Sequence, residues 1–400
     1  MVNVIGLGYI GLPTALMLAA HGVQVIGTDY NAEVVGKLNR GEVTFREDGL
    51  RELFQAAAEK GIQFSSSYAH TDVYIVSVPT PYNEKTKQID PCYVVSAVQE
   101  ILRVCPENAV VIIESTVSPG TIDRYVRPLL SSEKKIHLAH APERIIPGNM
   151  IYELKHNSRT IGADDPQIAA KIRDIYGSFC LGDIVLTDIR TAEMTKVIEN
   201  TYRAVNIAFA NELLMLCHKE GMDVNEIIRI CNMHPRVNIL SPGPGVGGHC
   251  IPVDPWFLVG DFPEQTPLIH RALQINADMP QYVYSRIVQL MQEHGICGFD
   301  RVGLYGLTYK EDVDDLRESP TLQLLRILDE KGQQCRVYDP MVKEGIVAGQ
   351  CACMEEFLDG VELVVVMVGH SALKVSVQQL QDKLVLDTRR VLHGENVCYL

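Results

Sequence analysis

The apolar positions of the chain follow two patterns, continuous β-rich runs and repeats at three- and four-residue intervals. A strand-like run, Val2–Ile5, is followed by a glycine cluster, a helix-like stretch, Thr14–His21, and a second strand-like run, Val23–Thr28. This order predicts a βαβ unit. Further runs at Val73–Val78 and Val110–Ile113, with helix-like stretches between them, predict a parallel sheet covered by helices on both faces.

The pattern changes in the middle of the chain. From Thr191 to Gly221, apolar residues recur at three- and four-residue intervals, which predicts one long helix that ends at the glycine. A segment rich in proline and glycine, 235–255, follows it, and a second helix is expected from about Thr266 to His294. We interpret this region as a helical connector.

Beyond residue 300 the alternation of strands and helices resumes. One helix is expected at Pro320–Lys331, and strands are expected at Arg301–Tyr305, Cys335–Tyr338, Val361–Val368 and Leu384–Leu386. The predicted fold is therefore α/β, with two Rossmann-like doubly wound domains joined by a long-helix α-helical central domain. We place the first Rossmann domain at 1–185, the central domain at 186–295 and the second Rossmann-like domain at 296–400.

Composition and charge exclude several classes of function. With 36 Lys and Arg against 50 Asp and Glu, the formal net charge of −14 argues against nucleic acid and anionic membranes as partners. The sequence has no run of the ~20 apolar residues that a membrane span needs and no recognisable secretory signal, so we expect a cytoplasmic protein. The 11 cysteines are scattered without metal-ligand spacing, which fits a reducing compartment and argues against bound metal.

A G-x-G-x-x-G cluster separates the first predicted strand from the first helix. Such glycines permit a tight turn, let a pyrophosphate approach the backbone, and bring the helix N-terminus to the anion. Asp29, at the end of the second strand, can accept hydrogen bonds from ribose hydroxyls and would repel a 2′-phosphate, so NAD is the predicted cofactor. The alternative is a turn that binds nothing. The expected cofactor turn comprises Gly6, Gly8, Tyr9, Ile10 and Gly11.

Two hydroxyl-bearing turns follow apolar strands of the first domain. They contain Thr80 and Thr116, at the carboxyl edge of the expected sheet, where ligands of open α/β folds bind. Their hydroxyl groups could line a cofactor or orient a water molecule. Helix caps and tight turns use the same residue types, and the sequence leaves both interpretations open.

Cys250 is the main candidate for covalent chemistry. It follows glycines at 243, 245, 247 and 248, which should leave the backbone bare and the thiol exposed. Asp254 is close enough in sequence to hold a water molecule or to influence the thiol. His249 should point away from Cys250 in an extended segment, so we assign it no catalytic role.

A thiol combined with NAD points to oxidation of a carbonyl group. An aldehyde cannot donate a hydride until a nucleophile adds to it, and a thiolate supplies that adduct. Loss of hydride then gives a thioester that water can cleave, so one site could carry out a four-electron oxidation of an alcohol. Lys196 and Asn200, four residues apart on one face of the long helix, are candidates to stabilise the oxyanion, although a solvated polar face is the alternative.

Over essentially its whole length the chain resembles the UDP-glucose/GDP-mannose dehydrogenase family. The segments Arg190–Lys196, Asn206–Leu213, His234–Leu240 and 250–257 are closest to its UDP-N-acetyl-D-mannosamine branch. The resemblance implies an NAD-dependent enzyme that oxidises C6 of a UDP-N-acetylhexosamine to the uronate, with UDP-N-acetyl-D-mannosamine as the expected substrate. The resemblance further implies that such uronates feed the biosynthesis of surface polysaccharides.

The resemblance also implies roles for individual residues. Cys250 matches the thiol nucleophile, and Asp254 matches a carboxylate that helps to activate water. Lys196 and Asn200 match the pair that stabilises oxyanionic intermediates. Glu143 matches a glutamate with an acid/base role exerted through water.

The cofactor and substrate contacts follow from the same resemblance. Thr116 matches a threonine near the nicotinamide, and Arg317 matches an arginine that reaches the cofactor. Arg236 lies in a loop whose counterpart crosses a dimer interface, and the C-terminal arginine motif admits Arg390 as well as its neighbour. The implied substrate contacts are Glu143, Arg144, Lys196, Asn200, Arg236, Gly247, Tyr309, Lys310 and Arg389.

Several alternatives remain open from the sequence. UDP-N-acetylglucosamine and UDP-glucose are alternative substrates, although Pro147 stands where the UDP-glucose enzymes have a glutamate. A one-step alcohol dehydrogenase would make one NADH per substrate, and a non-catalytic NAD-responsive interaction protein would make none. The long apolar helices predict a homodimer through the central region.

Overall fold

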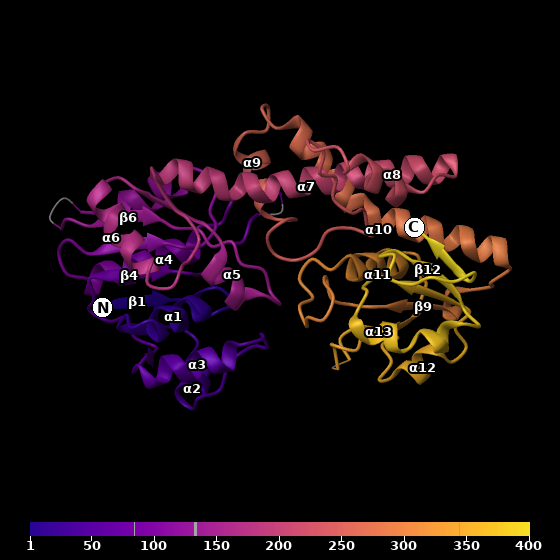
Figure 1. Cartoon of the computed structure of the whole chain (residues 1–400), viewed down its shortest axis with the longest axis horizontal. Helices are drawn as coiled ribbons and strands as arrows, with labels where there is room; N and C mark the ends of the chain where they lie inside the picture. The colour runs from indigo at the N-terminus through magenta and orange to yellow at the C-terminus, as the bar shows by residue number, and fades with distance from the viewer. Residues whose placement is uncertain (84, 132–133, 344) are drawn as a thin grey trace. The chain divides into compact units, whose positions relative to one another are not determined.

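The chain forms two compact units. The structure, a computed structural model, describes residues 1–83, 85–131, 134–343 and 345–400. Unit 1 comprises Met1–Glu199 and Trp256–Pro263, and unit 2 comprises Asn200–Pro255 and Glu264–Leu400. In Figure 1 the sheet of unit 1 is indigo to magenta and the sheet of unit 2 is orange to yellow. Each unit thus has its own sheet, as the predicted fold class requires.

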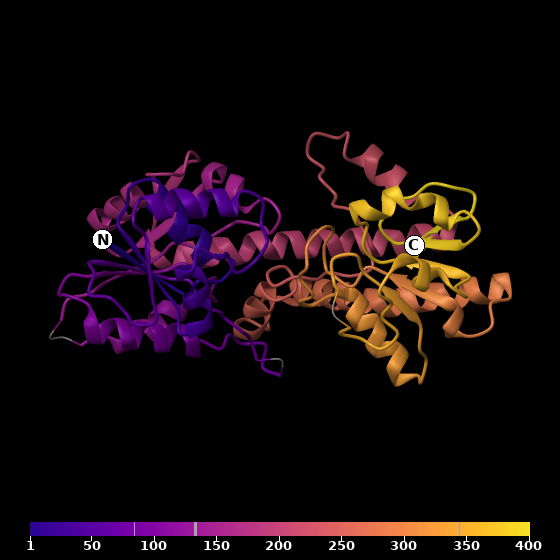
Figure 2. The same cartoon turned by 90° about the horizontal axis from the view of Figure 1, so that it is seen from below.

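Unit 1 contains an eight-stranded sheet of order β3-β2-β1-β4-β5-β6-β7-β8, in which every pair is parallel except β6 and β7. Its central strands are buried on both faces, which explains why their sequences are continuously apolar. Figure 2 shows helices on both sides of this sheet. The strands are β1 Val2–Ile5, β2 Val25–Thr28, β3 Gln63–Ser65, β4 Val73–Val76, β5 Val110–Ile113, β6 His137–His140, β7 Arg159–Ala163 and β8 Ile184–Thr187.

The first helix begins earlier than the sequence pattern indicated. It starts at Gly11 rather than Thr14, and Pro13 lies in its first turn, where a missing N–H group costs no hydrogen bond. The helices of unit 1 are α1 Gly11–Ala20, α2 Ala32–Asn39, α3 Leu50–Glu59, α4 Cys92–Val104, α5 Met150–His156 and α6 Pro166–Tyr176, with short helical turns at Ile122–Val126 and Arg127–Leu129.

Unit 2 contains a parallel five-stranded sheet of order β10-β9-β11-β12-β13. Helices of the central region pack on this sheet, because Leu214, Val283 and Ile287 share one core with Leu304 and Val365. The strands are β9 Val302–Tyr305, β10 Arg336–Tyr338, β11 Leu363–Val366, β12 Leu384–Asp387 and β13 Val397–Tyr399. The helices are α8 Val224–Cys231, α10 Pro267–His294, α11 Pro320–Glu330, α12 Met354–Leu358 and α13 Ser371–Val375, with short turns at Phe299–Arg301 and Val377–Leu380.

The long helix predicted in the central region is α7, Ile189–Glu220, with 32 residues. Its apolar repeat does not form one buried face. Tyr202, Phe209 and Leu216, seven residues apart, are each at least half exposed in unit 2. A second apolar face therefore runs along the helix. Within the described part of the chain, no helix combines the length and the apolar character needed to cross a membrane.

Candidate active site

In the turn between β1 and α1, packing alone requires two of the three glycines. Gly6 has a φ of +88°, and a Cβ on it would lie 2.3 Å from the carbonyl oxygen of Ser77. A Cβ on Gly11 would lie 1.9 Å from the carbonyl oxygen of Gly6. A Cβ on Gly8 would meet no atom within 4 Å. Packing therefore does not require glycine at Gly8, whereas close approach of a pyrophosphate would.

Asp29 fixes the shape of this turn. Its Oδ2 accepts a hydrogen bond from the Leu7 amide at 2.8 Å, and its Oδ1 accepts one from the Asn31 amide at 2.8 Å. Each oxygen can accept a further bond, so the carboxylate can still receive ribose hydroxyls. Tyr9 and Ile10 are half-buried and anchor the turn against the core.

The second sheet has a similar turn, but its carboxylate is already paired with a histidine. Gly306 also has a positive φ, and Asp339 accepts a hydrogen bond from the Leu307 amide at 2.5 Å. Here, however, the carboxylate is buried and lies 3.2 Å from Nε2 of His370. Thr308 stands where the first turn has an open glycine. Of the two turns, the first therefore fits a dinucleotide better.

The contrast between the glycines gives a test. Gly8→Ala should leave the free energy of unfolding unchanged but weaken NAD binding at least about tenfold, because a methyl group would occupy the path of the pyrophosphate. Gly11→Ala should destabilise the protein by about 1–3 kcal/mol through overpacking. Thermal unfolding and calorimetric titration with NAD would measure both effects. Undiminished NAD affinity of Gly8→Ala would exclude this turn as the pyrophosphate site.

Thr80 and Thr116 lie in turns that one serine ties together. The Ser115 hydroxyl donates a hydrogen bond to the carbonyl oxygen of Val78 at 2.7 Å and accepts one from the Val78 amide at 2.9 Å. Thr80 is buried, and Thr116 is half-buried. The turns after β4 and β5 are thus held side by side at the carboxyl edge of the first sheet, where the sequence predicted them.

Two further carboxylates hold the turn that follows Thr116. Glu193 on α7 accepts hydrogen bonds from the amides of Gly120 at 2.5 Å and Ile122 at 2.9 Å. Burial raises the pKa of Glu193 to about 7, against the effect of these hydrogen bonds. Ser118 donates to Asp261, the last residue of helix α9, Asp254–Asp261. The sequence pattern assigns no role to either acid.

Glu143 is buried just beyond the end of β6. Its Oε1 accepts a hydrogen bond from the Arg144 amide at 2.7 Å, and its Oε2 pairs with Arg159. The Arg144 side chain donates to Glu199 at 3.0 Å and to the Ser158 carbonyl oxygen at 2.7 Å. These bonds brace the loop that carries Glu143, and substrate contact by Arg144 stays a prediction.

Lys196, on α7, is buried in the same unit as Glu143. The charge of Lys196 affects the pKa of the buried His140 imidazole. Burial, with a further contribution from the Lys196 ammonium, lowers the pKa of His140 to about 3. A neutral His140 donates from Nδ1 to the Ile113 carbonyl oxygen at 2.8 Å. His140 therefore adds no positive charge beside the lysine near neutral pH.

Cys250 is exposed, as expected, and two of the glycines before it are also required by packing. A Cβ on Gly247 would lie 2.6 Å from Cβ of Tyr309, and one on Gly248 would lie 3.0 Å from its ring. The Gly248 amide also donates to the Arg317 carbonyl oxygen at 2.9 Å. The glycines thus allow close packing of Tyr309 on the loop, and the loop then presents the thiol.

Asn200 and Asp254 meet although 54 residues separate them. The Asn200 amide donates to Asp254 Oδ2 at 2.6 Å, and both side chains are 4% exposed. The Asp254 amide donates to the Cys250 carbonyl oxygen at 2.9 Å, so the acid begins α9 directly after the exposed thiol. An amide and a carboxylate thus meet within unit 2, next to the backbone of the residue that carries the thiol.

Two asparagines of α7 hold the segment that leads to Cys250. Asn206 accepts a hydrogen bond from the Leu240 amide at 3.0 Å and donates to the Asn238 carbonyl oxygen at 2.7 Å. Asn211 accepts from the Gly243 amide at 2.9 Å. The sequence pattern assigns no role to these two asparagines. Asparagine is a poor helix former, so its presence inside a helix is itself a signal of side-chain hydrogen bonding.

The C-terminal arginines have different partners. The Arg389 guanidinium lies against Gly243, because a Cβ on this glycine would be 3.1 Å from Arg389 Nη1. Its Nε donates to the Met367 carbonyl oxygen at 2.9 Å. Arg390 instead makes two bonds of 2.5 Å with Asp223. Of the two, Arg389 is therefore the one beside the segment that carries the cysteine.

The other predicted contacts are less constrained. Arg317 pairs with both carboxylate oxygens of Asp315, with its shortest hydrogen bond at 2.6 Å. Lys310 is half-buried and follows β9, whereas Arg389 follows β12, and β11 lies between these two strands. Arg236 is exposed. Burial and the nearby Arg317 lower the pKa of His249, so this imidazole stays neutral.

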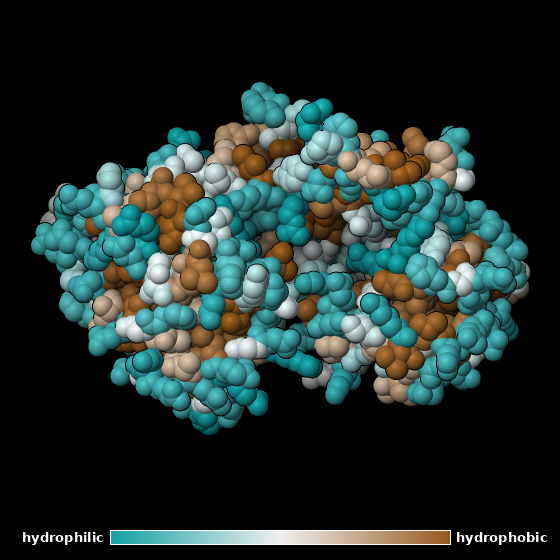
Figure 3. All heavy atoms as spheres, in the orientation of Figure 1, coloured by the Kyte–Doolittle hydropathy of each residue, from teal (hydrophilic) through white to brown (hydrophobic). Residues whose placement is uncertain are grey.

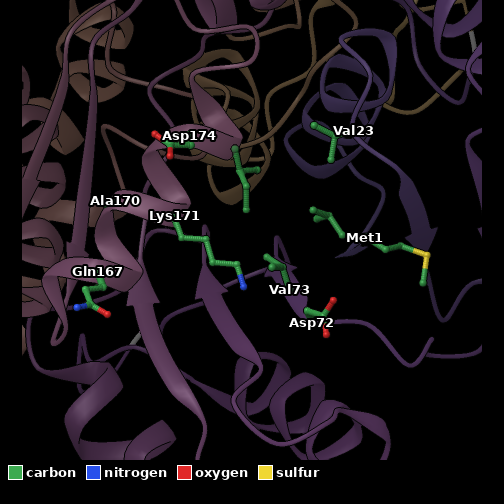
Figure 4. A pocket seen from close by; sticks show the side chains of 10 residues that line it. Met1, Val23, Asp72, Val73, Gln167, Ala170, Lys171 and Asp174 are labelled. Carbon is green, nitrogen blue, oxygen red and sulfur yellow. The ribbon is translucent and has the colours of Figure 1, made fainter.

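A hollow of about 720 Å³ lies away from all of these residues. Figure 4 shows Met1, Val73 and Lys171 among its lining side chains, at the amino ends of the strands. Ligands of open α/β sheets bind at the carboxyl ends, so we do not assign the active site to this hollow. Among the described residues, no group of three or more His, Cys, Asp and Glu could hold a metal ion.

Comparisons with known proteins cover the whole chain. Residues 1–180, 190–278 and 303–394 match the NAD binding, central and UDP binding domains of the UDP-glucose/GDP-mannose dehydrogenase family. A UDP-N-acetyl-D-mannosamine dehydrogenase of Methanococcus maripaludis is 40% identical over 401 residues, 97% of this chain and 92% of that protein. An NDP-N-acetyl-D-galactosaminuronic acid dehydrogenase of Ralstonia nicotianae is 38% identical over 416 residues, 99% of this chain and 97% of that protein. A solved UDP-N-acetyl-mannosamine dehydrogenase from Staphylococcus aureus has 37% identity and a TM-score of 0.88, over 100% of this chain and 97% of that one.

Proposed function

The chain belongs to the UDP-glucose/GDP-mannose dehydrogenase family of NAD-dependent enzymes, and we propose that it oxidises UDP-N-acetyl-D-mannosamine at C6 to the uronate. The family and the NAD cofactor expected from the sequence are thus confirmed. The observation that carries the proposal is the hydrogen bond between Asn200 and Asp254, whose backbone amide donates to the carbonyl oxygen of the exposed Cys250. The names of the relatives from Methanococcus and Staphylococcus support the choice of sugar.

The proposed reaction has two oxidations at one carbon. The C6 alcohol first loses a hydride to NAD and a proton, which gives the aldehyde. Cys250 adds through its sulfur to this aldehyde, and the thiohemiacetal loses a second hydride to a second NAD. Water cleaves the resulting thioester to the acid and restores the thiol. Two NADH therefore form for each uronate.

The other predicted site residues suit the charges that develop during this reaction. The Lys196 ammonium and the Asn200 amide would donate to the oxygen at C6 when it is negative, in the alkoxide and in the tetrahedral adducts. Asp254 and Glu143 would take protons from water during hydrolysis of the thioester. Each of these four side chains is buried, which strengthens its electrostatic effect.

Counting NADH per sugar tests the function. UDP-N-acetyl-D-mannosamine should give two NADH and one uronate, measured by absorbance at 340 nm and by mass spectrometry. One NADH with accumulating aldehyde would indicate a one-step alcohol dehydrogenase. Binding of NAD without NADH from any UDP-sugar would indicate a non-catalytic NAD-responsive protein.

Competition kinetics would decide the sugar. The N-acetylmannosamine, N-acetylglucosamine and glucose nucleotides differ at C2, and UDP-N-acetylgalactosamine should be included because the Ralstonia relative is named for N-acetyl-D-galactosaminuronic acid. We expect the highest kcat/KM for UDP-N-acetyl-D-mannosamine. A preference of tenfold or more for another sugar, about 1.4 kcal/mol, would overturn that assignment while leaving the reaction type intact.

We propose that the exposed apolar face of α7 and α8 joins two copies of the chain. Figure 3 shows hydrophobic surface over this region, where Phe209, Leu216, Ile230 and Met233 are at least half exposed. Phe209→Glu should convert the dimer to a monomer in sedimentation experiments, because it would bury charge at the contact. Tyr30→Glu, at an exposed site of unit 1, is the matched control. A wild-type monomer at micromolar concentration would contradict the proposal.

A further inference from the structure

The antiparallel strand β7 brings an arginine to Glu143. The β6–β7 register pairs Ala139 with Ala163 and His140 with Gly162. If this register continues, it places Arg159, the first residue of β7, opposite Glu143. The side chains follow that geometry, because the guanidinium pairs with Glu143 Oε2 and both side chains are less than 5% exposed.

A second buried carboxylate lies on the other side of Arg159. Glu114 comes directly after β5 and lies 3.7 Å from the guanidinium, an ion pair without a hydrogen bond. Its oxygens accept hydrogen bonds from Ser77 Oγ at 2.5 Å, Tyr176 at 3.0 Å and Thr14 at 3.4 Å. None of the roles described above uses this residue.

Two of these donors adjoin the dinucleotide turn. Thr14 lies in the first turns of α1, and the carbonyl of Ser77 packs against Gly6. Close packing therefore links the cofactor turn to Ser77, and polar contacts continue from there through Glu114 and Arg159 to Glu143. Every link lies within unit 1.

The charges of this cluster do not balance if both acids are ionised. Two carboxylates would share one guanidinium in a core without solvent, which leaves one negative charge buried at high cost. Burial, with repulsion from Glu143, raises the pKa of Glu114 to about 7 despite the nearby Arg159. The other titratable neighbours do not compensate, since burial keeps the Tyr176 phenol neutral and the Cys180 sulfur donates to the Asn157 carbonyl oxygen.

Two nitrogens of Arg159 are available for further hydrogen bonds to described residues. Its Nε and Nη1 make no hydrogen bond with any described residue, although the side chain is buried. The guanidinium lies 4.3 Å from the Tyr176 ring and 5.3 Å from the Phe179 ring, which hold it in place. Ionised Glu114 could therefore compete with Glu143 for the same guanidinium.

We propose that Arg159 and Glu114 are a buried positioning pair that holds the Glu143 carboxylate and couples it to the dinucleotide turn. This inference rests on the proposed function, in which Glu143 takes protons from water. Below pH 7 Glu114 is protonated, and Arg159 pairs with Glu143 alone. Above pH 7 the ionised Glu114 carboxylate attracts the Arg159 guanidinium away from Glu143, and Glu143 loses its position.

Glu114→Gln tests the coupling, because the amide keeps the shape of the acid but cannot ionise. We expect the ratio of kcat for this variant to kcat for wild type to rise roughly tenfold between about pH 6 and about pH 9, with a midpoint near 7. Comparing kcat as a ratio removes the titrations common to both proteins. The exposed Glu107→Gln is the matched control, with a flat ratio. A flat ratio for Glu114→Gln would overturn the inference and leave the cluster a purely structural one.

A second readout does not depend on turnover. The pKa of Glu114 is raised on folding from about 4.5 to about 7, so its contribution to stability is present at low pH and is lost as pH rises through this window. In Glu114→Gln the unfolding equilibrium should change about 10²-fold less than in wild type between pH 4.5 and 7.5. An unchanged slope would mean that Glu114 is not protonated in the fold.

Arg159→Lys tests the geometric step. Lysine keeps the charge but loses the planar fork, so kcat should fall about 10²-fold while KM for NAD and for sugar change less than about twofold. Loss of NAD affinity instead of kcat would contradict positioning of Glu143. Failure of wild type to make two NADH per sugar would overturn the proposed function alone, because the stability readout still reports on Glu114.

Discussion

Cys250→Ala should abolish formation of uronate. The variant can still form the aldehyde, but without a thiol no thiohemiacetal exists from which the second hydride could leave. We expect uronate production to fall by at least about 10³-fold, and NADH to reach at most one per sugar consumed. Absorbance at 340 nm and trapping of the aldehyde with hydroxylamine would measure the two products separately.

Cys353→Ala is the matched control for this prediction. Cys353 is another exposed cysteine of unit 2, but it lies before α12 and has no role in the proposed site. Its removal should leave two NADH per sugar. Uronate formation by Cys250→Ala at the wild-type rate would remove the thiol from the mechanism, whatever the control does.

The local parts of the dinucleotide site could be predicted from the sequence. The glycines of the first turn and Asp29 are adjacent along a βαβ unit, so their spacing encodes the geometry directly. The second turn shows what spacing does not encode. Asp339 occupies a comparable position, and only the structure reveals that His370 lies against it.

Partners that depend on strand order could not be predicted. Arg159 reaches Glu143 because β7 runs antiparallel to β6. No periodicity in the sequence predicts this change of strand direction. Glu114 follows an apolar strand as an ordinary polar residue would. Its burial depends on α1 and α6, which are distant in sequence, so the pattern around it carries no signal.

The sequence pattern gives only one of the two reasons for the glycines before Cys250. Their density marked the loop, and the thiol is exposed as expected. Their close packing against Tyr309 could not be deduced, because that ring comes from a turn after β9. The residue types were informative, whereas the contact that requires them is a property of the fold.

Asp254→Asn should stop the enzyme after the second oxidation. The amide can still accept the hydrogen bond that Asn200 donates at 2.6 Å, so the geometry is kept while the charge that activates water is lost. We expect a burst of about two NADH per active site, followed by turnover slowed by about 10²–10⁴-fold. Mass spectrometry should find the sugar nucleotide bound to Cys250 as a thioester that hydroxylamine releases.

The exposed Asp278→Asn on α10 is the matched control, because it makes the same chemical change away from the site and should retain full turnover. Two outcomes would contradict the role of Asp254. Steady turnover within about threefold of wild type would show that another group activates the water, with Glu143 as the next candidate. Loss of the burst itself would show that the carboxylate acts before the thioester forms, because hydrolysis cannot affect the first two hydride transfers.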